Sequence, residues 1–324
     1  MNSYIFYGSK EEFETKIPNN YNTLTEMAMK LDVNKMIVHI EGQTPEEDTD
    51  ERIFVENFVV SSQEYASVTE HVILNFANFI AKMDIKNIFL HNPPLQISNQ
   101  IERLYPKTII ERQEYKSITE DIIKKIALNY DEKVIGQKNV KNQILKAIMP
   151  LTFSDRIKPV VMLFYGKSGI GKTETANFIA ECLDEKIFRK QFSMFQNNQF
   201  STYLFGGTHS EKGFAKDLLD RQSNVILLDE FDKANSVFHS AFYQLFDEGI
   251  FEDQNYYVKL EKSIIICTSN YTSITEIKDA LGDAIYNRFD VIIGFDNLSP
   301  TAKTYIGDLC IKDTKERNPH KKNI

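Results

Sequence analysis

The stretch Gly166–Thr173 reads GKSGIGKT and has the residue types that bind a chain of phosphates. It follows the apolar run 160–165 and precedes helical apolar spacing over 173–183, which predicts a strand, a glycine loop and a helix. In that setting the loop N–H groups and the helix N-terminus point at a polyphosphate. Lys172 would reach the β- and γ-phosphates, and the Thr173 hydroxyl would bind Mg²⁺. The pattern predicts a nucleoside triphosphate site.

The whole loop and its first helical residue are expected to contact the nucleotide. These residues are Gly166, Lys167, Ser168, Gly169, Ile170, Gly171, Lys172, Thr173 and Glu174. Glycines at both ends of the loop permit backbone geometries that other side chains forbid. A glycine turn in an ordinary α/β unit is the alternative interpretation, but it does not explain the Lys-Thr pair.

Polar residues also end two further apolar runs, VILLDE over 225–230 and SIIICTSN over 263–270. Continuous apolar runs are typical of strands buried on both faces of a parallel sheet, and their carboxyl ends lie at the ligand edge. Asp229 would hold Mg²⁺, and Glu230 would polarise the attacking water as a base. Asn270 would orient that water or contact the γ-phosphate. Helix capping and turn formation are the alternatives, and the glycine loop upstream disfavours both.

These motifs, with others in the same order, resemble the AAA+ module of the Clp-type unfoldases. The resemblance covers residues 131–297 and is nearest to the second ATPase ring of ClpB and to the related torsins. Its segments are VIGQ (134–137), the glycine loop, VILLDE, FHSAFYQLFDEGIFED (238–253), CTSN and AIYNRFD (284–290). The resemblance implies an ATPase that remodels proteins, with ATP and Mg²⁺ as its ligands.

The resemblance also implies a fold and further site residues. It implies a three-layer α/β/α module built on a parallel sheet, with Val134 and Ile135 holding the adenine. It makes Asn270 the sensor residue, and it makes Arg288 an arginine that acts on the neighbouring subunit's nucleotide. Self-association into a ring and a protein client are the partners it implies.

Two regions depart from the family pattern. The stretch 201–219, where the family has a substrate-gripping loop, is shortened. Tyr203 and Phe205 could be the gripping aromatics, but core packing is the default interpretation. Residues 299–324 carry no Gly-x-Arg sensor, and we expect a vestigial lid with a polar, basic and frayed end. Autonomous hydrolysis and hydrolysis completed by a partner protein both remain open.

The sequence predicts a small α/β domain over residues 1–130, which we expect to bind a partner. The ATPase core is expected over residues 131–298. Four strands are expected at 35–40, 53–60, 87–90 and 108–112, and helices at 67–83 and 96–104. Ser117 is expected to begin a further helix, with Glu120 completing a capping box.

Composition excludes some classes of function. A net charge of −8 and a pI near 5.4 disfavour a protein built to hold nucleic acid, although a helicase-loader type remains a less favoured alternative. No run reaches transmembrane length, and we expect no secretion signal. Cysteines 182, 267 and 310 fit buried thiols of a cytoplasmic protein, and histidines 39, 71 and 91 are too irregularly spaced for a metal site. The other alternative to a protein-remodelling ATPase is a nucleotide-dependent switch or assembly factor.

Overall fold

The computed structural model describes residues 1–35, 52–153, 155–194, 199–234 and 236–317. The chain divides into two compact units, each with its own sheet. Unit 1 comprises Met1–Glu114, Asn198–Arg221 and Phe251–Val258, and unit 2 comprises Tyr115–Asn197, Gln222–Ile250 and Lys259–Ile324. Within the described ranges, no helix is both long enough and apolar enough to cross a membrane.

Unit 1 is built on a parallel sheet of five strands in the order β2-β3-β4-β1-β5. The strands are β1 (Asn2–Tyr7), β2 (Asn22–Thr23), β3 (Ile53–Val60), β4 (Met83–His91) and β5 (Ile109–Arg112). The helices are α1 (Lys10–Glu14), α2 (Leu24–Lys35), η1 (Glu64–Ser67), α3 (Glu70–Leu74), α4 (Phe76–Ile80) and α5 (Leu95–Leu104). The N-terminal α/β sheet is therefore confirmed.

Some predicted elements of unit 1 change in the structure. The helix expected over 67–83 is two short helices, α3 and α4, with Asn75 between them in a non-helical conformation. Met83, at the end of the predicted helix, instead begins β4. The strand expected at 35–40 lies outside the described residues except for Lys35, which ends α2. Strand β1 was not predicted. It pairs with β4 and β5, and its Ser3, Ile5 and Phe6 are buried.

Unit 1 also contains two stretches from the middle of the chain. These carry α9 (Gln199–Phe205), α10 (Phe214–Leu219), most of β9 (Ile250–Glu252) and most of β10 (Tyr257–Lys259). Backbone groups of the N-terminal part bond to them directly: Leu95 N–H donates to Asn255 O at 2.8 Å, and the His209 ring bonds Val68 O at 3.0 Å. The segment predicted as a shortened substrate loop is thus part of the N-terminal unit.

Unit 2 is built on a second parallel sheet of five strands, in the order β12-β6-β11-β8-β7. The strands are β6 (Val160–Tyr165), β7 (Phe188–Gln191), β8 (Val225–Asp229), β11 (Ile264–Ser269) and β12 (Val291–Gly294). Every residue of β8 and β11 is buried, as their continuous apolar sequences predicted. The carboxyl ends of β6, β11 and β8 meet at one edge, so that edge can gather side chains from three strands.

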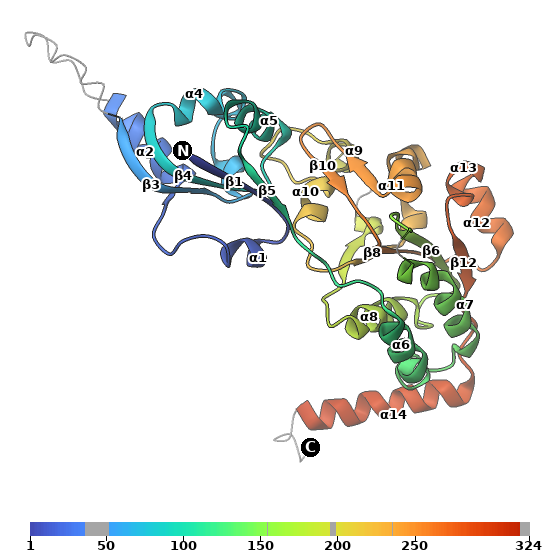
Figure 1. Cartoon of the computed structure of the whole chain (residues 1–324). Helices are drawn as coiled ribbons and strands as arrows, with labels where there is room; N and C mark the ends of the chain where they lie inside the picture. Colours follow the sequence, from blue (N-terminus) through green and yellow to red (C-terminus); the bar gives the residue numbers. More distant parts are fainter. Residues whose placement is uncertain (36–51, 154, 195–198, 235, 318–324) are drawn as a thin grey trace, which may run out of the picture. The chain divides into compact units, whose positions relative to one another are not determined.

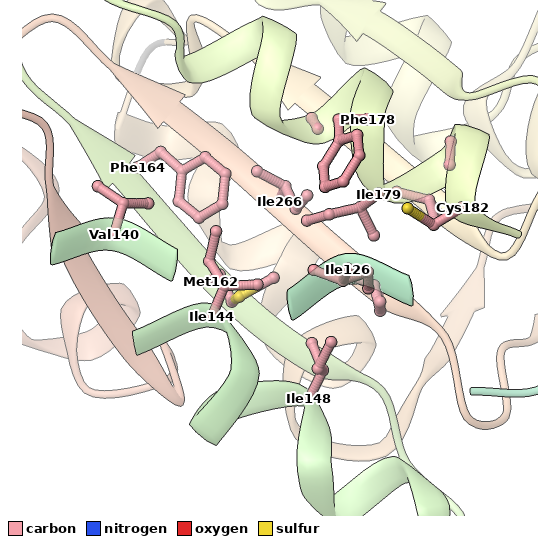
Figure 2. Packing of buried hydrophobic residues seen from close by; sticks show 14 of the residues in the cluster. Ile126, Val140, Ile144, Ile148, Met162, Phe164, Phe178, Ile179, Cys182 and Ile266 are labelled. Carbon is pink, nitrogen blue, oxygen red and sulfur yellow. The ribbon is translucent and has the colours of Figure 1, made fainter. Parts of the chain in front are cut away.

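Helices cover both faces of this sheet, which confirms the predicted three-layer α/β/α arrangement. The helices of unit 2 are α6 (Glu120–Lys133), α7 (Lys138–Ile148), η2 (Met149–Thr152), α8 (Lys172–Cys182), η3 (Phe192–Met194), η4 (Phe231–Lys233), η5 (Ser236–Phe242), α11 (Tyr243–Glu248), α12 (Ile274–Leu281), α13 (Asp283–Tyr286) and α14 (Pro300–Arg317). Figure 2 shows side chains of α6, α7 and α8 packed on Met162, Phe164 and Ile266 of one face. On the other side, Phe231 contacts the rings of Phe192 and Phe242.

Both ends of unit 2 differ from the prediction. The cap of α6 is Thr119, whose hydroxyl accepts a hydrogen bond from Ile122 N–H at 3.3 Å, so the helix begins later than the proposed Ser117 cap. Unit 2 starts at Tyr115, ahead of the predicted boundary at residue 130. At the other end, the stretch expected as a polar tail is helical from Pro300 to Arg317 as α14 (Figure 1).

Candidate nucleotide-binding site

The glycine loop joins β6 to α8, as the sequence predicted. Gly166 has φ +131°, and a Cβ there would lie 2.8 Å from the Phe295 carbonyl oxygen, so no larger residue fits. Gly171 caps the N-terminus of α8 with φ +104°. Because the first N–H groups of a helix lack intrahelical partners, this end of α8 can bind an anion.

Lys172 extends from the first turn of α8 back over the loop. Its Nζ donates to Gly166 O at 2.6 Å, to Lys167 O at 2.9 Å and to Asn270 Oδ1 at 3.2 Å. Burial lowers the pKa of the Lys172 ammonium, and the nearby carboxylates, Asp229 first, oppose that shift. The structure therefore places a partly desolvated cation between the loop and the end of β11.

Asp229 ends β8 and is held from the two flanking strands. Arg189 on β7 donates to its Oδ2 through Nε at 3.0 Å and also through Nη2. The Thr268 hydroxyl on β11 donates to its Oδ1. The Asp229 side chain is 8% exposed, so these bonds fix a nearly buried carboxylate at the sheet edge.

Glu230 follows directly and has a left-handed backbone conformation, with φ +55°. Such a conformation is costly for a residue with a side chain, and it is found preferentially at functional sites. The Glu230 N–H donates to Thr268 Oγ1 at 2.8 Å, and Gln191 Nε2 donates to Glu230 Oε2 at 3.0 Å. Hydrogen bonds from Ser193 and then Gln191 lower the pKa of the Glu230 carboxyl, which keeps it ionised at neutral pH.

These groups surround a cavity of about 810 Å³, a size that suits a nucleotide. Its lining residues are Lys133, Val134, Ile135, Ser168, Gly169, Ile170, Gly171, Lys172, Thr173, Glu174, Arg189, Gln191, Asp229, Glu230, Thr268, Asn270, Leu298, Ile306 and Leu309. The structure thus brings together the proposed adenine contacts, most of the loop, the acidic pair and Asn270. Gly166 and Lys167 are not among the lining residues.

Arg288 is the predicted site residue that the structure places elsewhere in unit 2. It is absent from the cavity lining, and its Nε donates to Asp247 Oδ2 at 2.8 Å. Its guanidinium carbon lies 4.1 Å from the centre of the Tyr243 ring. An arginine outside its own cavity is compatible with a role on another molecule.

The donor set beside the loop fits Mg²⁺. Mg²⁺ prefers oxygen ligands and is usually bound through one or two protein groups, waters and substrate phosphates. The Thr173 hydroxyl and the Asp229 carboxylate line the same cavity and supply such oxygens. No cluster of three or more histidine, cysteine or acidic ligands occurs among the residues described, so an all-protein metal cage is not what this part of the chain offers.

Seven lining residues were not predicted from the sequence: Lys133, Arg189, Gln191, Thr268, Leu298, Ile306 and Leu309. Three of them, Arg189, Gln191 and Thr268, contact the acidic pair. Arg189 and Gln191 come from the short strand β7, and Thr268 precedes the predicted Asn270 by two residues. Their contacts with the acidic pair follow from the strand order, in which β7 and β11 flank β8. The available signal was a threonine inside the CTSN motif and a basic residue in a strand-like FRKQ segment.

Comparisons with known proteins agree with this fold. The family profile of the AAA domain (Cdc48 subfamily) matches residues 157–294. The chaperone protein ClpB of Yersinia enterocolitica is 33% identical over 156 residues, which are 44% of this chain and 18% of that protein. The Clp protease ATP-binding subunit ClpL of Staphylococcus aureus is 28% identical over 244 residues, 68% of this chain and 34% of ClpL.

A solved structure shows the same fold. The Hsp104–ADP complex of S. cerevisiae superposes with a TM-score of 0.53 at 22% identity, covering 76% of this chain and 47% of that one. The chain therefore spans less than half of each of these three proteins. Residues 157–294 are an AAA+ domain related to the Clp chaperones.

Proposed function

We propose that the protein binds ATP with Mg²⁺, hydrolyses it, and uses the cycle to remodel a protein or a protein complex. The observation that carries this proposal is the cavity at the carboxyl ends of β6, β8 and β11. There Lys172, the acidic pair and Asn270 converge on the glycine loop. The relatives support it by their names, since ClpB is a chaperone and ClpL an ATP-binding subunit of a protease.

Each group has a role in attack of water on the γ-phosphoryl group. Lys172 would exchange its loop carbonyls for phosphate oxygens, and Val134 and Ile135 would hold the adenine. Mg²⁺ bound through Thr173 and Asp229 would neutralise charge on the phosphates. Glu230, ionised at neutral pH, would accept the proton of the attacking water. Asn270 would orient that water.

Two variants test the proposal. Lys172→Ala should lose ATP binding, because the ammonium that meets the phosphates is removed. Glu230→Gln should bind ATP and hydrolyse it at least about 100-fold more slowly, because the amide cannot accept a proton.

Binding is measured with a ribose-labelled fluorescent ATP, and turnover by phosphate release. Lys146→Ala, an exposed change on α7 outside the cavity, is the control. Wild-type turnover by Glu230→Gln would remove the assignment of the base.

A second candidate is a nucleotide-dependent switch or assembly factor that does not thread a client. The position of the shortened substrate-loop segment favours it, because that segment is built into unit 1 and Tyr203 is 7% exposed. A switch should show low basal turnover that rises when its partner protein is added. A threading ATPase should turn over without such a partner and lose client remodelling when exposed loop aromatics are changed.

A protein client or partner is the proposed ligand of residues 1–130, and ring assembly is the proposed setting for Arg288. The net charge of −8 argues against nucleic acid as the main partner. Titration with single- and double-stranded DNA at two salt concentrations checks this point. Tight, salt-dependent binding with stimulated turnover would favour a DNA-linked loader instead.

A further inference from the structure

Arg189 forms an ion pair with Asp229, whose carboxylate the proposed function assigns to Mg²⁺. Strand β7 pairs with β8 in parallel register, with Gln191 opposite Asp229. This register brings the Arg189 guanidinium alongside Asp229, where Nε and Nη2 both donate to Oδ2. The other oxygen, Oδ1, accepts from the Thr268 hydroxyl. Both oxygens of the proposed magnesium ligand are therefore engaged by protein donors.

The two partners of this ion pair differ in their freedom to move. The Asp229 side chain is 8% exposed and is fixed between two strands, whereas the Arg189 side chain is 46% exposed. A guanidinium and a divalent cation on one carboxylate would repel each other strongly in a partly desolvated cavity. When Mg²⁺ binds, the arginine is the group that can leave.

The cavity also determines where the released guanidinium can go. Arg189 lines the same cavity as the glycine loop, Lys172 and Thr173. The neighbouring carboxylate, Glu230, already accepts a hydrogen bond from Gln191. A loaded site also contains phosphate, and the planar fork of arginine matches phosphate oxygens in a bidentate geometry.

We propose that Arg189 holds Asp229 when no nucleotide is bound, and that Mg²⁺ displaces it onto the terminal phosphate of bound ATP. This inference rests on the proposed function. It makes Arg189 both a competitor of the metal and a sensor of the γ-phosphate. The move from Asp229 to phosphate is made by a side chain of the subunit that binds the nucleotide. Arg288, in contrast, is proposed to act on the nucleotide of a neighbouring subunit.

The two roles make opposite predictions for Arg189→Ala. Without the competing guanidinium, half-maximal binding of ribose-labelled fluorescent ADP should require several-fold less Mg²⁺. Without the phosphate contact, the preference for a non-hydrolysable ATP analogue over ADP should fall by about tenfold, the usual effect of one lost hydrogen bond to a charged group. Both quantities are binding measurements and do not depend on turnover.

Two further variants complete the test. Lys190→Ala changes a cation on the same strand that lies over the Phe188 ring and outside the cavity lining, and it should leave both quantities unchanged. Arg189→Lys keeps the charge without the fork, so it should restore the competition with Mg²⁺ but only part of the ATP preference. Retained circular dichroism and melting temperature show that each variant is folded.

The outcomes separate this inference from the proposed function. Weaker Mg²⁺ binding in Arg189→Ala, or no change in either quantity, would show that the arginine only supports the site, and would overturn the inference. Failure of the wild-type protein to bind either nucleotide with Mg²⁺ would overturn the proposed function itself, and the inference with it.

Discussion

Arg288 is the candidate catalytic side chain whose surroundings say most about assembly. Asp247 bonds its Nε, and the Tyr243 ring lies beneath its guanidinium. Both contacts come from α11, and neither places the guanidinium in the cavity that holds Lys172 and Glu230. A charge that stabilises the γ-phosphate must be close to it. We therefore propose that Arg288 contributes to hydrolysis on the nucleotide of a second copy of the chain.

The position of Arg288 outside its own cavity predicts the behaviour of mixed variants. Arg288→Ala should bind ATP as the wild type does, because the residue does not line the cavity, and should hydrolyse it about 1000-fold more slowly. Glu230→Gln should also be inactive, but it still carries the arginine. Mixing the two inactive proteins should restore turnover, because the intact site of Arg288→Ala then receives an arginine from Glu230→Gln.

Steady-state phosphate release at increasing ratios of the two proteins measures the restoration. The control is Arg288→Ala mixed with the double variant that lacks both groups, which should stay inactive. Turnover by Arg288→Ala alone at the wild-type rate would exclude the proposed role. Inactivity of every mixture would instead place the arginine's effect within its own subunit.

At the scale of single residues, the sequence alone could identify most of the cavity residues. It could not identify the side chains that contact the acidic pair. Asp229 and Glu230 were predictable because acidic residues directly after a buried strand lie at the ligand edge. Their contacts with Arg189, Gln191 and Thr268 were not, because these depend on which strands flank β8. Periodicity gives the type of each strand but does not give its neighbours in the sheet.

The element that departs most from expectation is the stretch that carries α9 and α10. It lies in sequence between β7 and β8 of the unit 2 sheet, yet by its contacts it belongs to unit 1. Tyr203 is buried there, and its hydroxyl donates to Asp217 Oδ2 at 2.7 Å. The Phe214 ring meets the Tyr203 ring edge-on at 6.0 Å. The default interpretation of Tyr203 as a packing residue is confirmed, whereas Phe205 is 43% exposed.

These environments predict unequal costs of substitution. Tyr203→Ala should lower the free energy of unfolding by about 3–5 kcal/mol, because it leaves a cavity in a packed core. Tyr203→Phe should cost about 1 kcal/mol through the lost bond to Asp217. Phe205→Ala should cost less than about 1 kcal/mol, because the ring is already partly in solvent. Urea unfolding followed by circular dichroism measures all three.

The same series separates packing from client contact. Loss of client remodelling in Tyr203→Ala alone would reflect damage to unit 1. Loss in the stable Phe205→Ala protein would instead support a client-contacting loop. A cost for Tyr203→Ala as small as that for Phe205→Ala would contradict the packing role.

At the scale of the whole molecule, the chain passes between its two units several times. Unit 1 is completed only by Asn198–Arg221 and Phe251–Val258, which follow the glycine loop in sequence. Helix α6 runs across the predicted boundary at residue 130, and its Ile126 and Tyr130 are buried in the core of unit 2. Sequence composition changes near residue 131, whereas side-chain packing changes earlier. The discontinuous unit could not be predicted, because no local pattern marks a segment that returns to a distant core.

Unit 1 also contains a histidine that makes its stability depend on pH. His91 ends β4 and is fully buried, with its Nε2 2.8 Å from Gly8 O and its ring stacked on Phe13 at 4.7 Å. Burial lowers its pKa to about 4. The Asp220 carboxylate lies 4.0 Å from Nε2. The other charged groups that act on it are Lys10, Lys216 and Glu11.

The sign of the effect follows from the two pKa values of His91. In the unfolded chain a histidine takes up its proton near pH 6.5, whereas the folded protein resists protonation until about pH 4. Between these values the unfolded state binds more protons, so stability falls as the pH falls, by about 2 kcal/mol at pH 5 from this residue alone. His91→Leu removes the titrating group and also the contact with Gly8. It should be less stable than the wild type at pH 7, and the difference should shrink toward pH 5. Urea midpoints at a series of pH values measure this, and parallel curves for the two proteins would show that His91 does not titrate on unfolding.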